Sequence, residues 1–242
     1  MRRKRRPLGQ GGMIAILTMA ALIAAALILF KSVYVVRHVE YTGQFDVHQD
    51  EITRAAGIRF GQSIFSVDEA AIRRGVNAMG EVELEDFRKR YPNTLVLQVR
   101  GRTSAGMFLF SGEIVEIDED GYVVRRETEA PNTDLLYISG LRAMQCRVGS
   151  LIDTQNGQRE AYAAVAQALR RNSASAYVSE LNLSDVNDLF LLTRLGVTVR
   201  LGDASNMNNK IAWMKSALMD MESRGEHGGT LDVHSGTKAD YI

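Results

Sequence analysis

The sequence predicts an α+β protein with one transmembrane helix at its N-terminus. Three observations predict this class: an uncharged apolar stretch over residues 13–30, a strand–helix–helix–strand–strand pattern behind it, and a strand-rich remainder with flanking helices. We expect a basic cytoplasmic tail over residues 1–11, a transmembrane helix over 12–32, a small α+β domain over 33–101, a β-rich domain over 102–236 and a C-terminal tail over 237–242.

The predicted membrane anchor follows a basic cluster. Residues 2–6 read Arg-Arg-Lys-Arg-Arg, and the uncharged stretch behind them is long enough to span a bilayer core. Basic residues in this position hold the N-terminus in the cytoplasm, so the rest of the chain is expected to be extracytoplasmic. A cleaved signal peptide is the alternative, but the following KSVYVV offers no small-x-small cleavage site. The basic tail is expected mainly to set topology, with lipid binding or a cytoplasmic contact as a further role.

The composition argues against nucleic acid as a partner. The chain carries 29 basic and 29 acidic residues; without the five basic residues at 2–6, 24 face 29, a net charge of −5. A mildly acidic body does not favour binding to phosphate backbones. The single cysteine, Cys146, excludes an intramolecular disulfide, and we interpret it as a small buried apolar residue.

The first domain is expected to open with a strand over residues 34–43 and two helices. The first helix is predicted to have Asp46 as its N-cap and to bury Ile52. The second is predicted to have Ser66 as its N-cap, because Glu69 follows at the capping-box spacing. The residues expected to follow helical periodicity as a stripe on this second helix are Val67, Ala70, Ala71, Arg74 and Ala78.

Two alternating strands are expected to complete the first domain. The first, over residues 81–91, is predicted to place Val82, Leu84 and Asp86 on one face and Phe87 on the other. The second follows a Tyr-Pro-Asn turn and is predicted to align Leu95, Leu97 and Val99 on one face. The result is a three-stranded sheet with two helices on one face.

The second domain is expected to combine many short strands with two helices. A hairpin turn is predicted at residues 118–121, and the expected strands cover residues 106–110, 113–117, 122–127, 134–141, 178–185, 188–193, 197–202 and 229–234. The predicted buried stripe of the helix over 157–171 comprises Ala161, Val165, Ala168 and Leu169. That of the helix over 206–223 comprises Met207, Ile211, Met214, Leu218 and Met221, broadened by Trp213 and Ala217. A core face is favoured for these methionines over a docking surface.

No constellation of residues predicts catalysis, so we expect no enzyme activity, no cofactor and no metal. The four histidines are scattered, and the DEDG turn lacks the later carboxylates of a calcium loop. The enzymatic alternative is an anchored envelope transpeptidase of sortase type that uses Cys146. Its expected pattern is poorly met, because Arg147 is adjacent to the cysteine and the nearest upstream histidine is the distant His48.

Several stretches, in this order and spacing, resemble the FtsQ/DivIB family of bacterial cell-division proteins. They are VRHVEYTGQFDVHQDEITRAAGIRFGQSIFSVD, FRKRYPNTLVLQVRGRTSA, IDEDGYV, LTRLGVTVRLG and GGTLDVH. The resemblance covers nearly the whole chain. Arg102 matches the family, but Gly101 stands where an acidic residue is usual and Ser104 where a proline is usual. A role of that acid at the domain junction is therefore not carried over.

The resemblance implies a POTRA domain (β-α-α-β-β) over residues 33–101 and a non-catalytic scaffold of the divisome at the septum. It also implies strand addition and docking of coiled-coil partners: FtsB/DivIC-like and FtsL-like proteins, with septal peptidoglycan synthases as further partners. The residues that it implies for partner binding are Leu231, Asp232, Val233, His234 and Tyr241. A generic POTRA-type interaction or chaperone module of the envelope is the second alternative.

Overall fold

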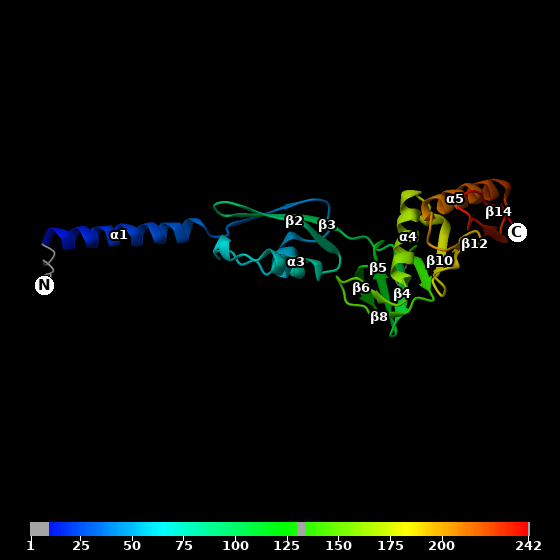
Figure 1. Ribbon diagram of the computed structural model, residues 1–242, viewed down its shortest axis with the longest axis horizontal. Helices are drawn as coiled ribbons and strands as arrows, with labels where there is room; N and C mark the ends of the chain where they lie inside the picture. Colours follow the sequence, from blue (N-terminus) through cyan, green and yellow to red (C-terminus); the bar gives the residue numbers. More distant parts are fainter. Residues whose placement is uncertain (1–9, 130–133, 242) are drawn as a thin grey trace, which may run out of the picture.

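The computed structural model describes residues 10–129 and 134–241. Figure 1 shows three parts in a row: an N-terminal helix, a small domain behind it and a larger domain at the other end of the molecule. We call residues 34–102 the N-terminal domain and residues 103–241 the C-terminal domain. The N-terminal helix and the C-terminus therefore lie at opposite ends of the molecule (Figure 1).

Helix α1, Gln10–Val33, contains the stretch predicted to cross the membrane. Large apolar side chains on it are exposed, among them Leu17, Leu22 and Ile23. Across the described residues, no helix is both long and apolar enough to span a bilayer. The predicted anchor is thus not confirmed. The basic tail over residues 1–9 lies outside the described residues, as do several side chains of α1, those of residues 26–29 among them.

The N-terminal domain has the predicted order of strand, helix, helix, strand and strand. Its sheet has the order β1-β3-β2, with β3 parallel to β1 and antiparallel to β2. Leu95, Leu97 and Val99 are fully buried on one face of β3, as predicted, and α2 and α3 pack there. The elements are β1 (His38–Thr42), α2 (Gln49–Ala55), the 3-10 turn η1 (Ile64–Ser66), α3 (Glu69–Asn77), β2 (Val82–Arg90) and β3 (Thr94–Gly101).

The two predicted N-caps are wrong. Helix α2 starts after His48 rather than after Asp46, because Phe45 and Val47 pack against the core and keep the chain extended. Helix α3 is capped by Asp68, whose side chain accepts a hydrogen bond from the N–H of Ala70 at 3.0 Å.

The predicted cap Ser66 instead ends the short turn η1. Its hydroxyl donates to the carbonyl of Ser63 at 2.7 Å. Burial of Val67 holds the chain extended behind this turn and delays the start of α3. The predicted stripe on α3 is therefore also wrong, because Ile72 and Val76 are buried while Ala70, Ala71, Arg74 and Ala78 are exposed.

A β-bulge corrects the predicted alternation in β2. The pairing of β2 with β3 shifts register between Leu84 and Asp86, so that Glu85 is the extra residue. Behind the bulge the two faces are exchanged. Phe87 is therefore buried with Val82 and Leu84, although strict alternation placed it on the opposite face.

The C-terminal domain is built on one nine-stranded sheet with the order β14-β13-β12-β11-β10-β7-β4-β5-β6. All predicted strands are present, and β5 and β6 flank the predicted turn at residues 118–121. The strands are β4 (Gly106–Phe110), β5 (Glu113–Ile117), β6 (Val123–Glu127), β7 (Leu136–Ser139), β10 (Val178–Asn182), β11 (Leu189–Thr193), β12 (Thr198–Gly202), β13 (Thr230–Asp232) and β14 (Asp240–Tyr241). A small hairpin of β8 (Ala143–Gln145) and β9 (Asp153–Thr154) and the 3-10 turn η2 (Ser175–Tyr177) complete it.

Two helices, α4 (Gln158–Arg171) and α5 (Met207–Arg224), pack against each other beside this sheet (Figure 1). The four stripe residues predicted on α4 and the five predicted on α5 are buried, so Met207, Met214 and Met221 form a core face as favoured. Of the two residues expected to broaden the α5 stripe, Ala217 is partly buried and Trp213 has 43% of its surface exposed. Trp213 lies about 100° around the helix from Met214 and therefore off a narrow buried stripe.

Candidate partner-binding site

The candidate site is the C-terminal edge of the nine-stranded sheet. Strand β13 runs parallel to β12, with Leu231 opposite Val199. Asp240 and Tyr241, which the sequence predicted to lie in a C-terminal tail, form the next strand, β14. This strand pairs antiparallel with β13 and places Tyr241 opposite Leu231. The free edge of the sheet is therefore β14, which contains only two residues.

The five sequence-predicted site residues are brought together here but divide into two groups. Leu231 and Val233 are 2% and 0% exposed and belong to the core of the C-terminal domain. Asp232, His234 and Tyr241 retain exposed surface around the edge. Only this second group can offer side chains to a partner, while the first holds β13 in place.

A charged cluster lies beside β13. The N–H of His234 donates to Oδ1 of Asp232 at 2.9 Å, and its Nδ1 lies 2.6 Å from the same oxygen. Arg200 lies 3.9 Å from the other oxygen of Asp232. Burial raises the pKa of Asp232, but the hydrogen bonds from His234 and the positive charges outweigh it, so the pKa lies below its usual value.

A cleft of about 310 Å³ adjoins this cluster and has room for a partner side chain. Arg200, Asp203 and His234 are among the residues that line it. Hydrogen bonds from Ser205 and Lys210 lower the pKa of Asp203 to about 2. The ammonium of Lys210 is 1% exposed and lies 3.0 Å from the Asp203 carboxylate, so this acid compensates a buried charge at the start of α5.

Tyr241 fixes β14 through one polar contact and one close approach. Its hydroxyl donates to the carbonyl of Gly228 at 3.2 Å. Gly229 has a φ of +88°, and a side chain there would bring Cβ to 2.3 Å from the tyrosine oxygen. The glycine therefore makes room for the ring. With 59% of Tyr241 exposed, β14 is held lightly.

The start of the opposite edge of the large sheet is covered by the chain itself. The N–H of Val123 in β6 donates to Ser150, and its carbonyl accepts from Gly149. Tyr122 forms a further bridge with Leu151. The loop before β9 thus occupies the start of the outer side of β6.

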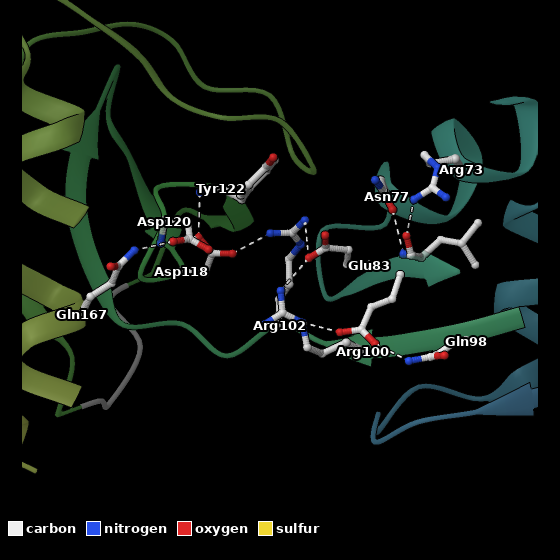
Figure 2. A network of polar contacts seen from close by, with 12 residues as sticks. Arg73, Asn77, Glu83, Gln98, Arg100, Arg102, Asp118, Asp120, Tyr122 and Gln167 are labelled. Atoms are coloured by element: carbon white, nitrogen blue, oxygen red, sulfur yellow. Dashed lines mark hydrogen bonds and ion pairs between the residues drawn. The ribbon is translucent and has the colours of Figure 1, made fainter. Parts of the chain in front are cut away.

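In the N-terminal domain, the two sheet edges also differ. Strand β3 is central, so it cannot accept another strand. On β2, side chains of α3 occupy the bulge region: Asn77 accepts from the N–H of Leu84 at 2.9 Å, and Arg73 donates to the carbonyl of Leu84 (Figure 2). No described strand pairs with the outer side of β1, which is the more open edge.

A buried arginine joins the two domains (Figure 2). The guanidinium of Arg102 is 3% exposed and lies 2.6 Å from Asp118 in the C-terminal domain and 3.1 Å from Glu83 in the N-terminal domain. It also lies over the ring of Tyr122, 3.9 Å from the ring centre. The sequence analysis named Arg102 as a residue that matches the family and placed Asp118 in a hairpin turn, but only the fold shows that the two form an ion pair.

Glycines allow the two domains to approach closely. A Cβ at Gly149, φ +76°, would lie 1.9 Å from the carbonyl oxygen of Asn77, and a Cβ at Gly80 would lie 2.2 Å from that of Val124. Backbone therefore meets backbone at this junction, and a side chain at Gly149 or Gly80 would separate the domains.

Cys146 does not meet the conditions of a catalytic nucleophile. It is 4% exposed within the core of the C-terminal domain. Burial raises the pKa of its thiol to about 11, against a smaller opposite effect of Arg126. Within the described residues, no group of three histidine, cysteine or acidic side chains could hold a metal ion. The transpeptidase alternative therefore has no support in the geometry.

A small three-stranded sheet with two helices, joined through Arg102 to a second domain built on a nine-stranded sheet, defines a two-domain α+β protein whose first domain has the order of a POTRA domain. Residues 35–102 match the family model of the POTRA domain, FtsQ-type, and residues 110–233 match that of the cell division protein FtsQ/DivIB, C-terminal. The chain belongs to the FtsQ/DivIB family of cell-division proteins, as the resemblance predicted.

Two relatives illustrate the similarity. The cell division protein FtsQ of Myxococcus fulvus is 27% identical over 172 residues, which cover 69% of this chain and 58% of that protein. The cell division protein DivIB of Clostridium tetani is 20% identical over 200 residues, 82% of this chain and 75% of that protein. The chain thus spans less than two thirds of the Myxococcus protein.

Proposed function

We propose that this protein is a non-catalytic, single-pass membrane scaffold of the bacterial divisome that links division proteins at the septum. The observation that carries the proposal is the lightly covered edge of β13 at the end of the molecule opposite α1 (Figure 1). Such an edge offers backbone donors and acceptors to an extended segment of another chain.

The partner strand takes the place of β14. Strand β14 contributes two residues and the Tyr241 hydroxyl contact, and backbone hydrogen bonds of this kind each stabilise by about 1 kcal/mol. A longer partner strand replaces these bonds and adds more. Asp232, His234 and the adjoining cleft then provide selectivity through the side chains that alternate along the added strand.

The partners proposed are FtsB/DivIC-like and FtsL-like membrane proteins, with septal peptidoglycan synthases in the same assembly. A coiled-coil partner that rises from the membrane and ends in an extended segment fits an edge distant from α1. The outer side of β1 is a second candidate surface on the N-terminal domain for strand addition.

The anchor proposed is the segment over residues 12–32, with the N-terminus cytoplasmic and both domains extracytoplasmic. The support comes from the uncharged residues 13–30, the basic cluster before them and the exposed apolar side chains of α1. Enrichment at the septum follows from the family's role in cell division.

Calorimetry tests the proposed site. The soluble part of the chain, residues 33–242, is titrated with the extracytoplasmic part of the FtsB/DivIC-like protein from the same organism. Two truncations are compared: one ends at Gly228 and lacks β13 and β14, and the other ends at Ala239 and lacks β14 alone. We expect the first to lose binding and the second to bind about tenfold more tightly, because no strand must be displaced.

Circular dichroism of each truncation checks that the fold is retained. A proline at Glu40 in β1 serves as a matched control on the other candidate edge and is expected to leave binding unchanged. If the proline variant loses binding and the truncation at Gly228 does not, the site lies on the N-terminal domain. If no form binds, the division partner is wrong.

A further inference from the structure

Four aromatic rings form a continuous cluster where α1 meets the N-terminal domain. Phe30, near the end of α1, stacks on Phe65 with ring centres 5.8 Å apart and planes at 6°. Tyr34 contacts both of these rings, at 4.4 Å and 5.4 Å, and Tyr91 lies 5.5 Å from Phe65. The aromatic patch is defined as these four residues together with Phe60, whose neighbour Gly61 donates its N–H to the carbonyl of Val36 at 2.8 Å.

Backbone pairing places the patch beside the end of α1. The N–H of Val36 donates to the carbonyl of Gln62, and the N–H of Ile64 donates to that of Tyr34. Val35 and Ser63 form a bridge between the same two segments. The segment around residue 60, cyan in Figure 1, therefore lies against the end of the helix.

The patch is more exposed than packing within the chain requires. Phe60, Phe65, Tyr91 and Phe30 are 63%, 51%, 54% and 48% exposed. The core of the N-terminal domain is complete without them, since its buried cluster is built from residues such as Ile52, Ile64 and Leu95. Exposed aromatic surface gathered in one place marks an interaction surface.

The surroundings of the patch fit a lipid surface. It continues directly from α1, whose described side chains include many exposed apolar groups. Arg37 and Arg59 are exposed beside it, and neither takes part in an ion pair within the described part of the chain. Tyrosine and phenylalanine flanked by cations are the side chains that occupy the headgroup region, where anionic lipids attract the cations.

We propose that the aromatic patch seats the N-terminal domain in the headgroup region of a bilayer that contains anionic lipid. This inference rests on the proposed anchor, because α1 must enter the same bilayer. Seating fixes the tilt of the N-terminal domain on the membrane. Since Arg102 and the junction glycines join the domains closely, it also directs the C-terminal domain away from the surface.

Tryptophan quenching by brominated lipids tests the proposal on the full chain in vesicles of phosphatidylethanolamine and phosphatidylglycerol. The only tryptophan, Trp213, lies on α5 in the C-terminal domain and is the natural control. In a Trp213→Phe background, Phe60→Trp places the probe in the patch and keeps it aromatic. Leu22→Trp places a second probe on the exposed apolar surface of α1.

Bromine quenches only at contact. We expect lipid brominated near the glycerol backbone to lower the emission of the residue-60 probe about twofold and leave Trp213 unchanged. We expect lipid brominated deeper to quench the residue-22 probe. Adding Arg59→Glu should reduce quenching at residue 60 without affecting residue 22, because the charge then repels the anionic headgroups.

The outcomes separate the two proposals. Quenching at residue 22 but none at residue 60 overturns the seating and leaves the anchor intact. Absence of quenching at both overturns the anchor and the seating together. Equal quenching at residue 60 and at Trp213 shows a chain lying flat on the vesicle and also overturns the proposal.

Discussion

Replacement of Arg102 by alanine tests most directly how the two domains are held together. Its guanidinium is 3% exposed and joins Glu83 of the N-terminal domain to Asp118 of the C-terminal domain. Arg102→Ala leaves Asp118, whose side chain is 9% exposed, with backbone N–H donors alone. A buried carboxylate then loses the charge that compensates it.

The expected loss of stability is about 3 kcal/mol. Removal of one partner from a buried ion pair costs about 3–5 kcal/mol. The lower end applies because Glu83 is 27% exposed and keeps Arg100 as a second partner. Arg100→Ala is the matched control: it pairs with the same Glu83 within the N-terminal domain but is 52% exposed, so its removal should cost about 0.5 kcal/mol.

The assay is urea denaturation of the detergent-solubilised chain, followed by circular dichroism. A double-mutant cycle of Arg102→Ala with Asp118→Asn should give a coupling of at least about 1 kcal/mol across the junction. Arg102→Lys should recover only part of the stability, because an ammonium cannot reach two carboxylates with separate nitrogens.

Equal losses for Arg102→Ala and Arg100→Ala would refute the reasoning. They would mean that burial at the junction adds nothing to the ion pair. A coupling with Asp118 near zero would show that the arginine acts within the N-terminal domain alone.

Three further predictions follow from individual contacts. Gly149→Ala should destabilise by at least about 2 kcal/mol in the same urea assay, because its Cβ meets Asn77; Gly225→Ala, which has a similar φ and open space, should cost about 1 kcal/mol. The pKa of Asp203 is about 2 in the folded chain and 3.8 ordinarily, so its contribution to the free energy of unfolding is complete above about pH 4 and is lost as the pH falls toward 2. Asp203→Asn should therefore lower the free energy of unfolding at pH 7 but not in acid. A difference between variant and wild type that does not change with pH would contradict this. With a pKa of about 11 instead of 9.0, Cys146 should react with a disulfide reagent at pH 8 at least about a hundredfold more slowly than after denaturation, and equal rates would contradict its burial.

The elements with strong periodicity were predictable from the sequence. The alternating strand β3 and the five-residue stripe of α5 appear with the expected faces buried, because a single buried face fixes each pattern. The N-caps were not predictable, since packing of Val47 and Val67 decides where each helix starts. The exchange of faces at Glu85 depends on pairing with β3 and leaves no mark in β2 itself.

Contacts between distant segments account for the rest. Residues 231–234 were placed at the site by resemblance, but the strand that covers them consists of Asp240 and Tyr241, too short a segment for any periodicity. The Arg102 pair likewise required the orientation of one domain on the other. The aromatic patch is a further example, because Phe30 and Phe65 are far apart in the sequence and only the fold stacks their rings.

The unequal edges of the nine-stranded sheet limit how copies of the chain could join by strand pairing. A sheet open on both sides can grow by joining copies edge to edge, and the product is a filament. Here the start of β6 is occupied by residues 149–151, while β14 at the other side lies free within the described chain. Strand pairing at this sheet is therefore obstructed at the start of β6 and open at β14. Copies of this chain would therefore favour a single strand addition at the β14 edge over growth into a filament.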